Sequence, residues 1–347
     1  MITFVMAVYN TRIEWIDRAV DSVINQTKPD WELIIVDDGS GESVAQHCDE
    51  LLKQDSRIHI HHQKNQGLSV SRNYGMDNAH GQWVTFIDAD DWIEKTYVEQ
   101  IEKVLNNHCY LEMLAIGHDD IWGDNVIERL WGNEDYHEFD IDEKEDMQMA
   151  LFQMPEALHS YPMFFGAQWK VIYSIEFLNR YNIRNTPGLN KAQDSVFNLY
   201  AVEYAEKIGY YNKVLYHYYH NSESVTGTKY TKDLERLRRL IKAYNDFVEQ
   251  TNKKSDTTFQ RAYKKRALIE AESMLACYFA NKSNTDSVNV RRNRYNEVLD
   301  REPYLSLFID YSMAGLSMYQ KLLWLTLKNR NYLLSCNLYK IKNIIKR

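Results

Sequence analysis

The sequence lacks any run of about 18 apolar residues, the length that a membrane-spanning helix requires. It opens without a basic leader or a small-residue cleavage site, so we expect no secretory signal. Its few cysteines form no C-x-x-C pair and have no histidine at zinc-finger spacing; they are Cys48, Cys109, Cys277 and Cys336. These absences predict a reduced, intracellular protein, which we expect in the cytoplasm.

Basic residues are also in deficit. Forty-nine acidic and 41 basic residues give a formal charge of −8, which argues against nucleic acid as a partner because phosphate binding needs a basic surface. The balance reverses in residues 311–347, which contain seven Lys or Arg and no Asp or Glu. The length of 347 residues predicts about two domains.

The hydrophobic pattern alternates between short apolar runs and amphipathic helical stretches. Apolar runs at 2–8, 32–36, 57–61 and 83–87 are separated by helical patterns such as 13–25 and 44–54. This spacing predicts an α/β fold with a mainly parallel sheet flanked by helices.

Further along, we expect strands at 111–116 and 210–219, an irregular stretch from 117 to about 146, and helices almost throughout from 232. We therefore divide the chain into 1–110 and 111–230, the two halves of one α/β domain, and a C-terminal region. Residues 231–347 would form a helical C-terminal domain.

Three carboxylates, Asp88, Asp90 and Asp91, occupy four positions directly after the fourth apolar run. Like charges this close raise one another's proton affinity, and a divalent cation between them relieves the repulsion. In a parallel sheet, ligands lie beyond the carboxyl ends of the strands, where these residues fall. Mn²⁺ or Mg²⁺ held by Asp88 and Asp90 could bridge to phosphate oxygens of a bound nucleotide.

The first strand-to-helix turn, residues 7–11, contains no glycine, so the backbone cannot approach a pyrophosphate as it does in dinucleotide-binding folds. A sugar nucleotide held through a metal fits this turn better. The same lack of glycine disfavours a sugar-nucleotide pyrophosphorylase. An aspartyl phosphatase would carry its D-x-D on the first strand, and residues 2–8 carry none.

Four motifs in this order resemble the inverting family-two glycosyltransferases with a GT-A type fold. They are Ala7-Val8-Tyr9-Asn10, Asp37-Asp38-Gly39-Ser40, Gly67 through Asn73, and Phe86-Ile87-Asp88-Ala89-Asp90-Asp91. The resemblance implies a metal-dependent transferase that moves a sugar from a nucleotide sugar, such as a UDP-sugar, to an acceptor. It makes 1–110 the nucleotide-sugar-binding half and 111–230 the acceptor-binding half of the catalytic domain.

The resemblance also implies roles for individual positions. Val8, Tyr9 and Asp38 would surround the nucleotide base, with Asp38 accepting a hydrogen bond from its N–H. Asp88 and Asp90 would form the D-x-D metal pair, with Ala89 beside the donor. Asp91 would cap the following helix or contact the donor sugar.

Arg72 is a single arginine on the first turns of a predicted helix. The resemblance places it near the donor diphosphate. From the residues alone, a structural ion pair with Asp38 or Asp88 is an equal alternative.

A second constellation, Gly188 through Phe197, resembles the E-D-x-x-F segment of the family, with Gln193 in place of Glu. The resemblance makes Asp194 the catalytic base; without it, an acid capping or opening a helix is the simpler interpretation. Upstream, Ala167 through Tyr173 resembles the W-N-K-x-Y stretch, but Lys170 and Val171 replace Asn and Lys. Contacts made by those two positions therefore do not transfer.

His217 and His220 lie on the aromatic strand pattern at 210–219 and the turn after it. The sequence leaves open whether they contact a metal or diphosphate or simply pack on the strand.

In the tail, Leu334, Leu338, Ile341 and Ile345 share one helical face with lysines on its margins. Upstream, Leu316, Leu323 and Leu327 repeat the pattern around Trp324. Such a stripe suits either a helix lying on an anionic membrane or one packed on its own domain. Residues 331–347 are therefore a candidate for peripheral contact with the inner face of the cell membrane.

We expect the acceptor to be a glycan, a lipid-linked saccharide or a glycoprotein, in cell-surface polysaccharide synthesis. A protein glycosyltransferase, and a degenerate, non-catalytic sugar-nucleotide-binding protein, remain as alternatives. A homo-oligomer is compatible with the sequence, which does not identify the donor sugar, the linkage or the oligomeric state.

Overall fold

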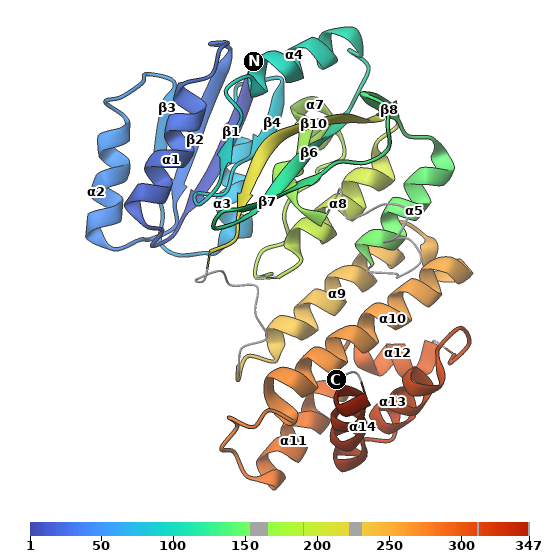
Figure 1. Cartoon of the computed structure of the whole chain (residues 1–347). Helices are drawn as coiled ribbons and strands as arrows, with labels where there is room; N and C mark the ends of the chain where they lie inside the picture. Colours follow the sequence, from blue (N-terminus) through green and yellow to red (C-terminus); the bar gives the residue numbers. More distant parts are fainter. Residues whose placement is uncertain (153–165, 190, 222–230, 311, 346–347) are drawn as a thin grey trace. The chain divides into compact units, whose positions relative to one another are not determined.

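The computed structural model describes residues 1–347 except 153–165, 190, 222–230, 311 and 346–347 (Figure 1). It divides into two compact units. The first comprises Met1–Leu151 and Pro155–Ser224, and the second comprises Phe152–Met154 and Val225–Arg347.

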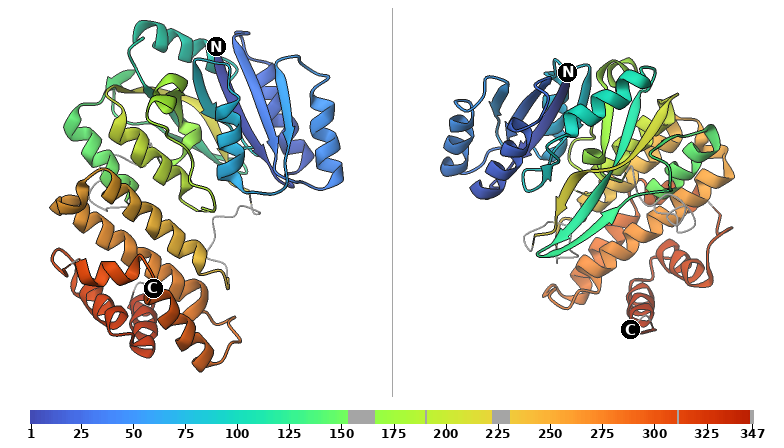
Figure 2. Two further views of the ribbon diagram at one scale, coloured as in Figure 1. Left: turned by 180° about the vertical axis from the view of Figure 1, so that it is seen from behind. Right: turned by 45° about the horizontal axis from the view of Figure 1, so that its top comes forward.

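The first unit is built on one twisted sheet with helices on both faces (Figure 2). Its parallel part follows the order β3-β2-β1-β4, with β1 (Ile2–Val8), β2 (Trp31–Asp37), β3 (Ile58–His62) and β4 (Trp83–Phe86). All seven residues of β2 are buried, as are six of the seven in β1, which is why both strands read as continuous apolar runs.

The sheet continues past β4 with strands of mixed direction. β9 (Val171–Ser174) lies antiparallel between β4 and β6 (Met113–Trp122), β6 pairs in parallel with β10 (Ile208–Tyr219), and β5 (Trp92–Ile93) lies antiparallel at the edge. The architecture is therefore mixed α/β with a parallel core.

The expectation of irregular structure over 117–146 was wrong. β6 runs on to Trp122 and turns through Gly123 into β7 (Asn125–Arg129), and β8 (Tyr136–Glu138) pairs with β10. Every residue of β7 is exposed, so this edge strand has no apolar alternation by which the sequence could reveal it.

The helices of the first unit connect these strands in βα order. They are α1 (Ile13–Ile24), α2 (Glu42–Leu51), α3 (Leu68–Asp77), α4 (Tyr97–Asn107), α5 (Ile141–Leu151), α7 (Ile175–Arg180) and α8 (Gln193–Tyr204). A single 3-10 turn, η2 (Gln168–Lys170), precedes β9. The turns that follow β1, β2 and β4 lie at the carboxyl ends of the parallel strands, as the sequence predicts.

The second unit contains only helices among its described residues. They are α9 (Glu235–Gln250), η3 (Lys253–Ser255), α10 (Thr257–Met274) with a π-helical end at Leu275–Phe279, α11 (Val288–Leu299), α12 (Tyr304–Asp310), α13 (Met318–Lys328) and α14 (Tyr332–Ile345). Side-chain oxygens of Asp256, Ser287 and Ser317 cap α10, α11 and α13, which explains where these helices begin.

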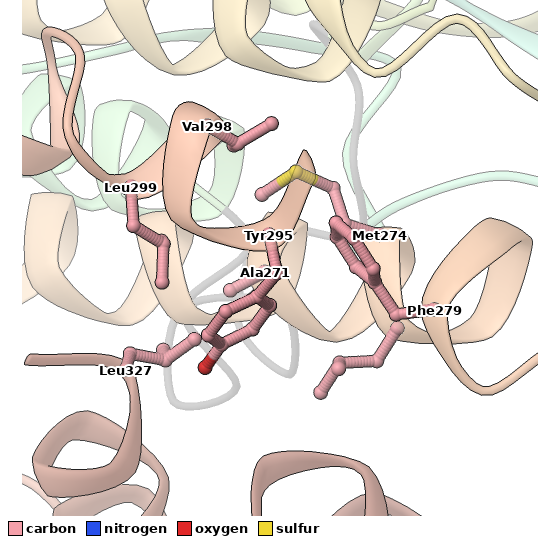
Figure 3. Close-up of a pocket in the computed structure, with 8 residues that line it drawn as sticks. Ala271, Met274, Phe279, Tyr295, Val298, Leu299 and Leu327 are labelled. Carbon is pink, nitrogen blue, oxygen red and sulfur yellow. The ribbon is translucent and has the colours of Figure 1, made fainter. Parts of the chain in front are cut away.

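A small cavity in this unit is lined by apolar side chains from α10, α11 and α13 (Figure 3). Its volume of about 10 Å³ leaves room for roughly one water molecule, so we regard it as a packing gap. Within the described part of the chain, no helix is both long and apolar enough to span a bilayer.

Candidate active site

The carboxylate turn after β4 is held in place by one buried tyrosine. The Tyr216 hydroxyl donates to Asp91 Oδ2 (2.7 Å) and accepts from the Asp88 backbone N–H (3.0 Å). Asp91 Oδ1 also accepts from the Tyr219 backbone N–H at 2.8 Å. Burial, and then the charges of Asp88 and Asp90, raise the pKa of Asp91 well above its usual value. Asp91 therefore anchors the turn to β10, whereas the sequence suggested a helix cap or a donor contact.

Asp90 lies on the more open side of the same turn. Its Oδ2 accepts from Asn221 Nδ2 (2.6 Å), and its backbone oxygen accepts from Arg18, whose guanidinium lies over the Trp92 ring. Burial and the charge of Asp88 raise the pKa of Asp90 to about 6. A bound cation would favour the ionised form of this side chain.

The carboxylates of the turn after β4 could serve as part of the ligand shell of a hard divalent cation. Within the described residues, no three His, Cys, Asp or Glu side chains are grouped so as to hold a metal ion. Asp88 and Asp90 would therefore supply two carboxylates, and Mg²⁺ or Mn²⁺ commonly takes one or two from the protein and the rest of its shell from phosphate and water. The residues present fit a cation that arrives with a diphosphate.

Arg72 is the centre of the site. Its side chain, 2% exposed, projects from α3; Nη2 donates to Asp88 Oδ1 (2.8 Å), and Nη1 donates to Asp194 Oδ1 (2.5 Å) and Gln168 Oε1 (2.8 Å). Although burial opposes it, the two carboxylates raise the pKa of Arg72. The sequence offered Asp38 or Asp88 as an ion-pair partner of Arg72. The pair with Asp88 is present, and the second partner is Asp194 rather than Asp38.

Asp194 stands in the first turn of α8 with a side chain 15% exposed. The N-cap of α8 is Ala192, so Asp194 is not the cap; it is an acid in the first turn of the helix, as the other simple interpretation of the sequence has it. Its carboxylate instead bonds to Arg72 and, more weakly, accepts from the Gln168 backbone N–H at 3.4 Å. Burial raises the pKa of Asp194, and the Arg72 charge opposes this shift.

Gln168 and Tyr216 are site residues that the sequence analysis did not single out. Both lay inside segments that it quoted, but nothing in those segments shows which side chain turns toward the carboxylates. Gln168 is fully buried, and its Oε1 fixes the Arg72 guanidinium between the two acids.

Asp38 is buried, and its carboxylate holds the loop before α3. Oδ1 accepts from Gln66 N–H (2.8 Å) and Gln63 Nε2 (2.6 Å), and Oδ2 accepts from Gly67 N–H (2.8 Å). A carboxylate accepts about four hydrogen bonds, so one acceptor position remains. Gly67 has φ 90° there, a conformation that suits glycine.

The other predicted donor-site residues differ in accessibility. Tyr9 is 55% exposed at the end of β1, whereas the side chains of Val8 and Ala89 are buried. The backbone oxygen of Val8 accepts from the Asp38 N–H at 2.8 Å. Tyr9 is thus free to face a ligand with its ring, and Val8 supports the turn that carries Asp38.

The two histidines of the aromatic strand are each engaged with acids. His217 lies between Asp119 (2.9 Å) and Glu94 (3.1 Å) and stacks on Trp92. His220 Nε2 lies 3.0 Å from Asp120 Oδ1, and its ring stacks on Trp122. Packing and pairing with acids account for both rings, while a contact with metal or diphosphate stays a prediction.

Comparison with known proteins defines the family. Residues 3–159 match the model described as Glycosyl transferase family 2. Residues 3–159 therefore resemble a family 2 glycosyltransferase domain.

Two relatives and one solved structure illustrate the relationship of this glycosyltransferase to known proteins. Glycosyltransferase GlyA of Streptococcus pneumoniae is 30% identical over 227 residues, which are 62% of this chain and 30% of GlyA. TuaG of Bacillus subtilis, named for teichuronic acid biosynthesis, is 34% identical over 111 residues, 31% of this chain and 44% of TuaG. This chain therefore spans less than half of either relative.

The crystal structure of S. aureus TarS 1-349 in complex with UDP-GlcNAc superposes with a TM-score of 0.66 at 16% sequence identity. The alignment covers 99% of this chain and 91% of that one. The likeness establishes the fold, and the nucleotide-sugar ligand is a property of that structure.

Proposed function

We propose that the protein is a metal-dependent inverting glycosyltransferase that moves a sugar from a UDP-sugar to a saccharide acceptor in cell-surface polysaccharide synthesis. The observation that carries the proposal is the buried Arg72 guanidinium, which holds Asp88 of the D-x-D turn and Asp194 at its two ends. Donor-binding and proton-accepting groups are thereby adjacent in one rigid cluster.

Asp194 is the proposed base. It would take the proton of the acceptor hydroxyl while that oxygen attacks the anomeric carbon from the face opposite the nucleotide, a geometry that parallels inverting glycoside hydrolysis. Arg72 and Gln168 orient its carboxylate, and the pKa that burial raises makes it a stronger proton acceptor than an exposed aspartate.

Asp88 and Asp90 would hold Mn²⁺ or Mg²⁺, which supplies neutralisation of the diphosphate charge when it is bound. Arg72 engages Oδ1 of Asp88, so Oδ2 is the oxygen left for a cation. At the base end of the donor, Tyr9 offers an open ring for stacking, and Asp38 offers its remaining acceptor position to an N–H of the base.

A polysaccharide-type acceptor is favoured by the relatives, one of which bears a name in teichuronic acid biosynthesis. A protein glycosyltransferase would use the same donor-binding residues and the same base, so these residues do not distinguish a protein acceptor from a saccharide acceptor. A non-catalytic sugar-nucleotide-binding protein would retain donor binding and have no use for a base, so the test below also distinguishes this alternative.

Substitution of the proposed base tests the function. In Asp194→Asn, we expect sugar transfer to fall by about 10² to 10⁴-fold, while calorimetry with UDP and Mn²⁺ shows largely retained binding. Glu176→Gln, which removes an exposed acid on α7, is the control and should transfer normally. Loss of UDP binding together with transfer would assign Asp194 a structural role and refute its assignment as base. EDTA should remove UDP binding and Mn²⁺ should restore it.

Contact with an anionic membrane surface is the second part of the proposal. On α14, Leu334 and Ile341 of the predicted stripe are 46% and 52% exposed, and Ile344 is 72% exposed. The opposite face packs inward through Tyr332, Ser335 and Cys336, whereas the upstream stripe around Trp324 is buried. The side chain of Ile345 lies outside the described ones. The exposed side chains of α14 support the membrane alternative for this helix, and the burial around Trp324 supports packing for the upstream stripe.

Exposed aliphatic side chains among lysines suit the headgroup boundary of an anionic bilayer. Leu334→Ser combined with Ile341→Ser should abolish flotation with vesicles containing phosphatidylglycerol. Val126→Ser combined with Ile127→Ser, two exposed positions on β7, is the matched control and should float normally. Equal flotation of the α14 double variant and the β7 double variant would refute membrane contact through α14. So would an α14 double variant that still floats normally and loses only its self-association.

A further inference from the structure

A second cluster of polar and aromatic side chains adjoins the base on the η2 side. η2 begins at Gln168, which bonds to Arg72, and continues with Trp169 and Lys170. Trp169 stacks on Tyr216 (4.3 Å between centroids, 14° between planes) and on Tyr218 (5.3 Å, 18°). The segment that positions the base therefore also carries Lys170.

Lys170 is a half-buried cation that makes no direct ion pair with any described residue, although the charge of Asp120 acts on it. Its Nζ lies 4.9 Å from the Trp169 ring centroid, and within the described part of the chain it has no ion pair or hydrogen bond. Burial lowers the pKa of Lys170 to about 8. The charge of Asp120 only partly offsets the cost of burying this ammonium, so a group that brings further negative charge is favoured there.

Asp120, the acid whose charge acts on this cation, is already engaged. Asp120 Oδ2 accepts from Arg129 Nε (2.6 Å), and Oδ1 lies 3.0 Å from His220 Nε2. His118, on the same strand and 8% exposed, packs edge-on against Trp169, and its Nδ1 has no hydrogen-bond partner among the described residues. A ring nitrogen without a hydrogen bond and an ammonium without a direct ion pair thus flank one tryptophan.

The cluster continues to a surface that suits a sugar ring. Tyr218 packs edge-on against His220 (4.4 Å), and His220 stacks on Trp122 (4.0 Å, 12°), which is 39% exposed. The parallel register of β6 with β10 pairs His118 with Tyr216 and Asp120 with Tyr218, so these side chains project from adjacent strands. Aromatic faces next to a cation suit a saccharide with a charged substituent.

Resting on the proposed transferase function, we infer that Lys170, His118, Trp169, His220 and Trp122 form an acceptor subsite for an anionic group, a phosphate ester or a carboxylate, on a sugar or polyol. We name it the Lys170 subsite. Its cation stands where the family-two pattern has a neutral asparagine, so it distinguishes this chain in its choice of acceptor and leaves the chemistry at Asp194 unchanged.

The test compares matched acceptors that differ in charge. With a UDP-sugar and Mn²⁺, transfer is measured to glucose, glucose 6-phosphate and glucuronate, and kcat/KM for each anionic acceptor is divided by that for glucose. The phosphate and carboxylate arms identify which anion is preferred. In Lys170→Gln, we expect this ratio to fall about ten-fold or more, because one charge-assisted hydrogen bond is lost. Lys170→Arg should keep most of the preference.

Lys213→Gln, which removes an exposed lysine of β10, is the control and should leave the ratio unchanged. A ratio unaltered in Lys170→Gln would overturn the inference, and so would a raised KM for the UDP-sugar, because the ammonium would then serve the donor. If none of the three acceptors is used, the binding of inorganic phosphate is measured by calorimetry for the wild type and for Lys170→Gln. Equal phosphate binding by the two proteins would likewise overturn the inference.

Failure of the subsite and failure of the function are distinguishable. If transfer from the UDP-sugar is lost in Asp194→Asn but the wild type shows no preference for anionic acceptors, the proposed function stands and the Lys170 subsite is rejected.

Discussion

Removal of the Arg72 guanidinium is the sharpest test of the buried cluster. Arg72→Met keeps the length and apolar stem of the side chain but leaves Asp88 and Asp194 without their shared counter-charge. Breaking a buried ion pair by removing one partner costs about 3–5 kcal/mol, since an uncompensated charge remains in a poorly solvated place. We expect the free energy of unfolding to fall by about that amount.

A second substitution tests the cause. If the penalty comes from an uncompensated Asp194 charge, then Asp194→Asn in the Arg72→Met background should recover part of the lost stability, about 1 kcal/mol or more. The same Asp194→Asn change in the wild type removes an ion pair and should be neutral or destabilising. A double-mutant cycle of the four proteins therefore yields a coupling energy between the two positions.

The assay is urea-induced unfolding, with midpoints compared at constant m-value. Arg57→Met is the matched control: Arg57 forms a bidentate pair with Asp55 over the Trp31 ring, but its side chain is 32% exposed, so we expect a loss of only about 0–1 kcal/mol for the ion pair. A loss in Arg72→Met no larger than in the control, or additive effects in the cycle, would refute the reasoning.

Two other predictions concern the turn and the subsite. Tyr216→Phe should lower the free energy of unfolding by about 1–3 kcal/mol and weaken Mn²⁺-dependent UDP binding, because Asp91 loses a buried donor; calorimetry showing unaltered UDP binding would mean that the Tyr219 N–H alone holds the turn. Burial lowers the pKa of Lys170 to about 8, so its charge, and with it the preference for anionic acceptors, should disappear as pH rises through about 8. Among the described residues, the charged groups that act on Lys170 are Asp120 and Arg129; Lys170 in turn acts on His118, and His220 is bonded to Asp120. Burial lowers the pKa of His118 to about 3, and hydrogen bonds from His220 and Arg129 outweigh burial to lower that of Asp120, so neither changes charge between pH 7 and 9. An acceptor ratio that stays flat over this range would contradict the prediction.

Much of the parallel part of the fold follows from local pattern. The apolar runs at β1, β2 and β4 are buried on both faces of the sheet, which forces nearly every position to be apolar, so their bounds were predicted to within one residue at most positions. The far end of β6 was harder to predict, because the polar residues His118, Asp119 and Asp120 are buried there by pairing with distant side chains. β7 was missed for the opposite reason, since all its residues are exposed.

The amino-acid sequence by itself determined that three carboxylates close a buried strand, because a strand and its turn are local features. It also placed Asp194 at the start of a helix. Only the tertiary structure decided that one guanidinium joins these two places: Arg72 and Asp194 lie 122 positions apart, and Arg72 and Gln168 lie 96 apart. Local periodicity shows which face a side chain takes, but its ion-pair partner depends on which strands lie side by side in the sheet, and that order is fixed by packing of the whole unit.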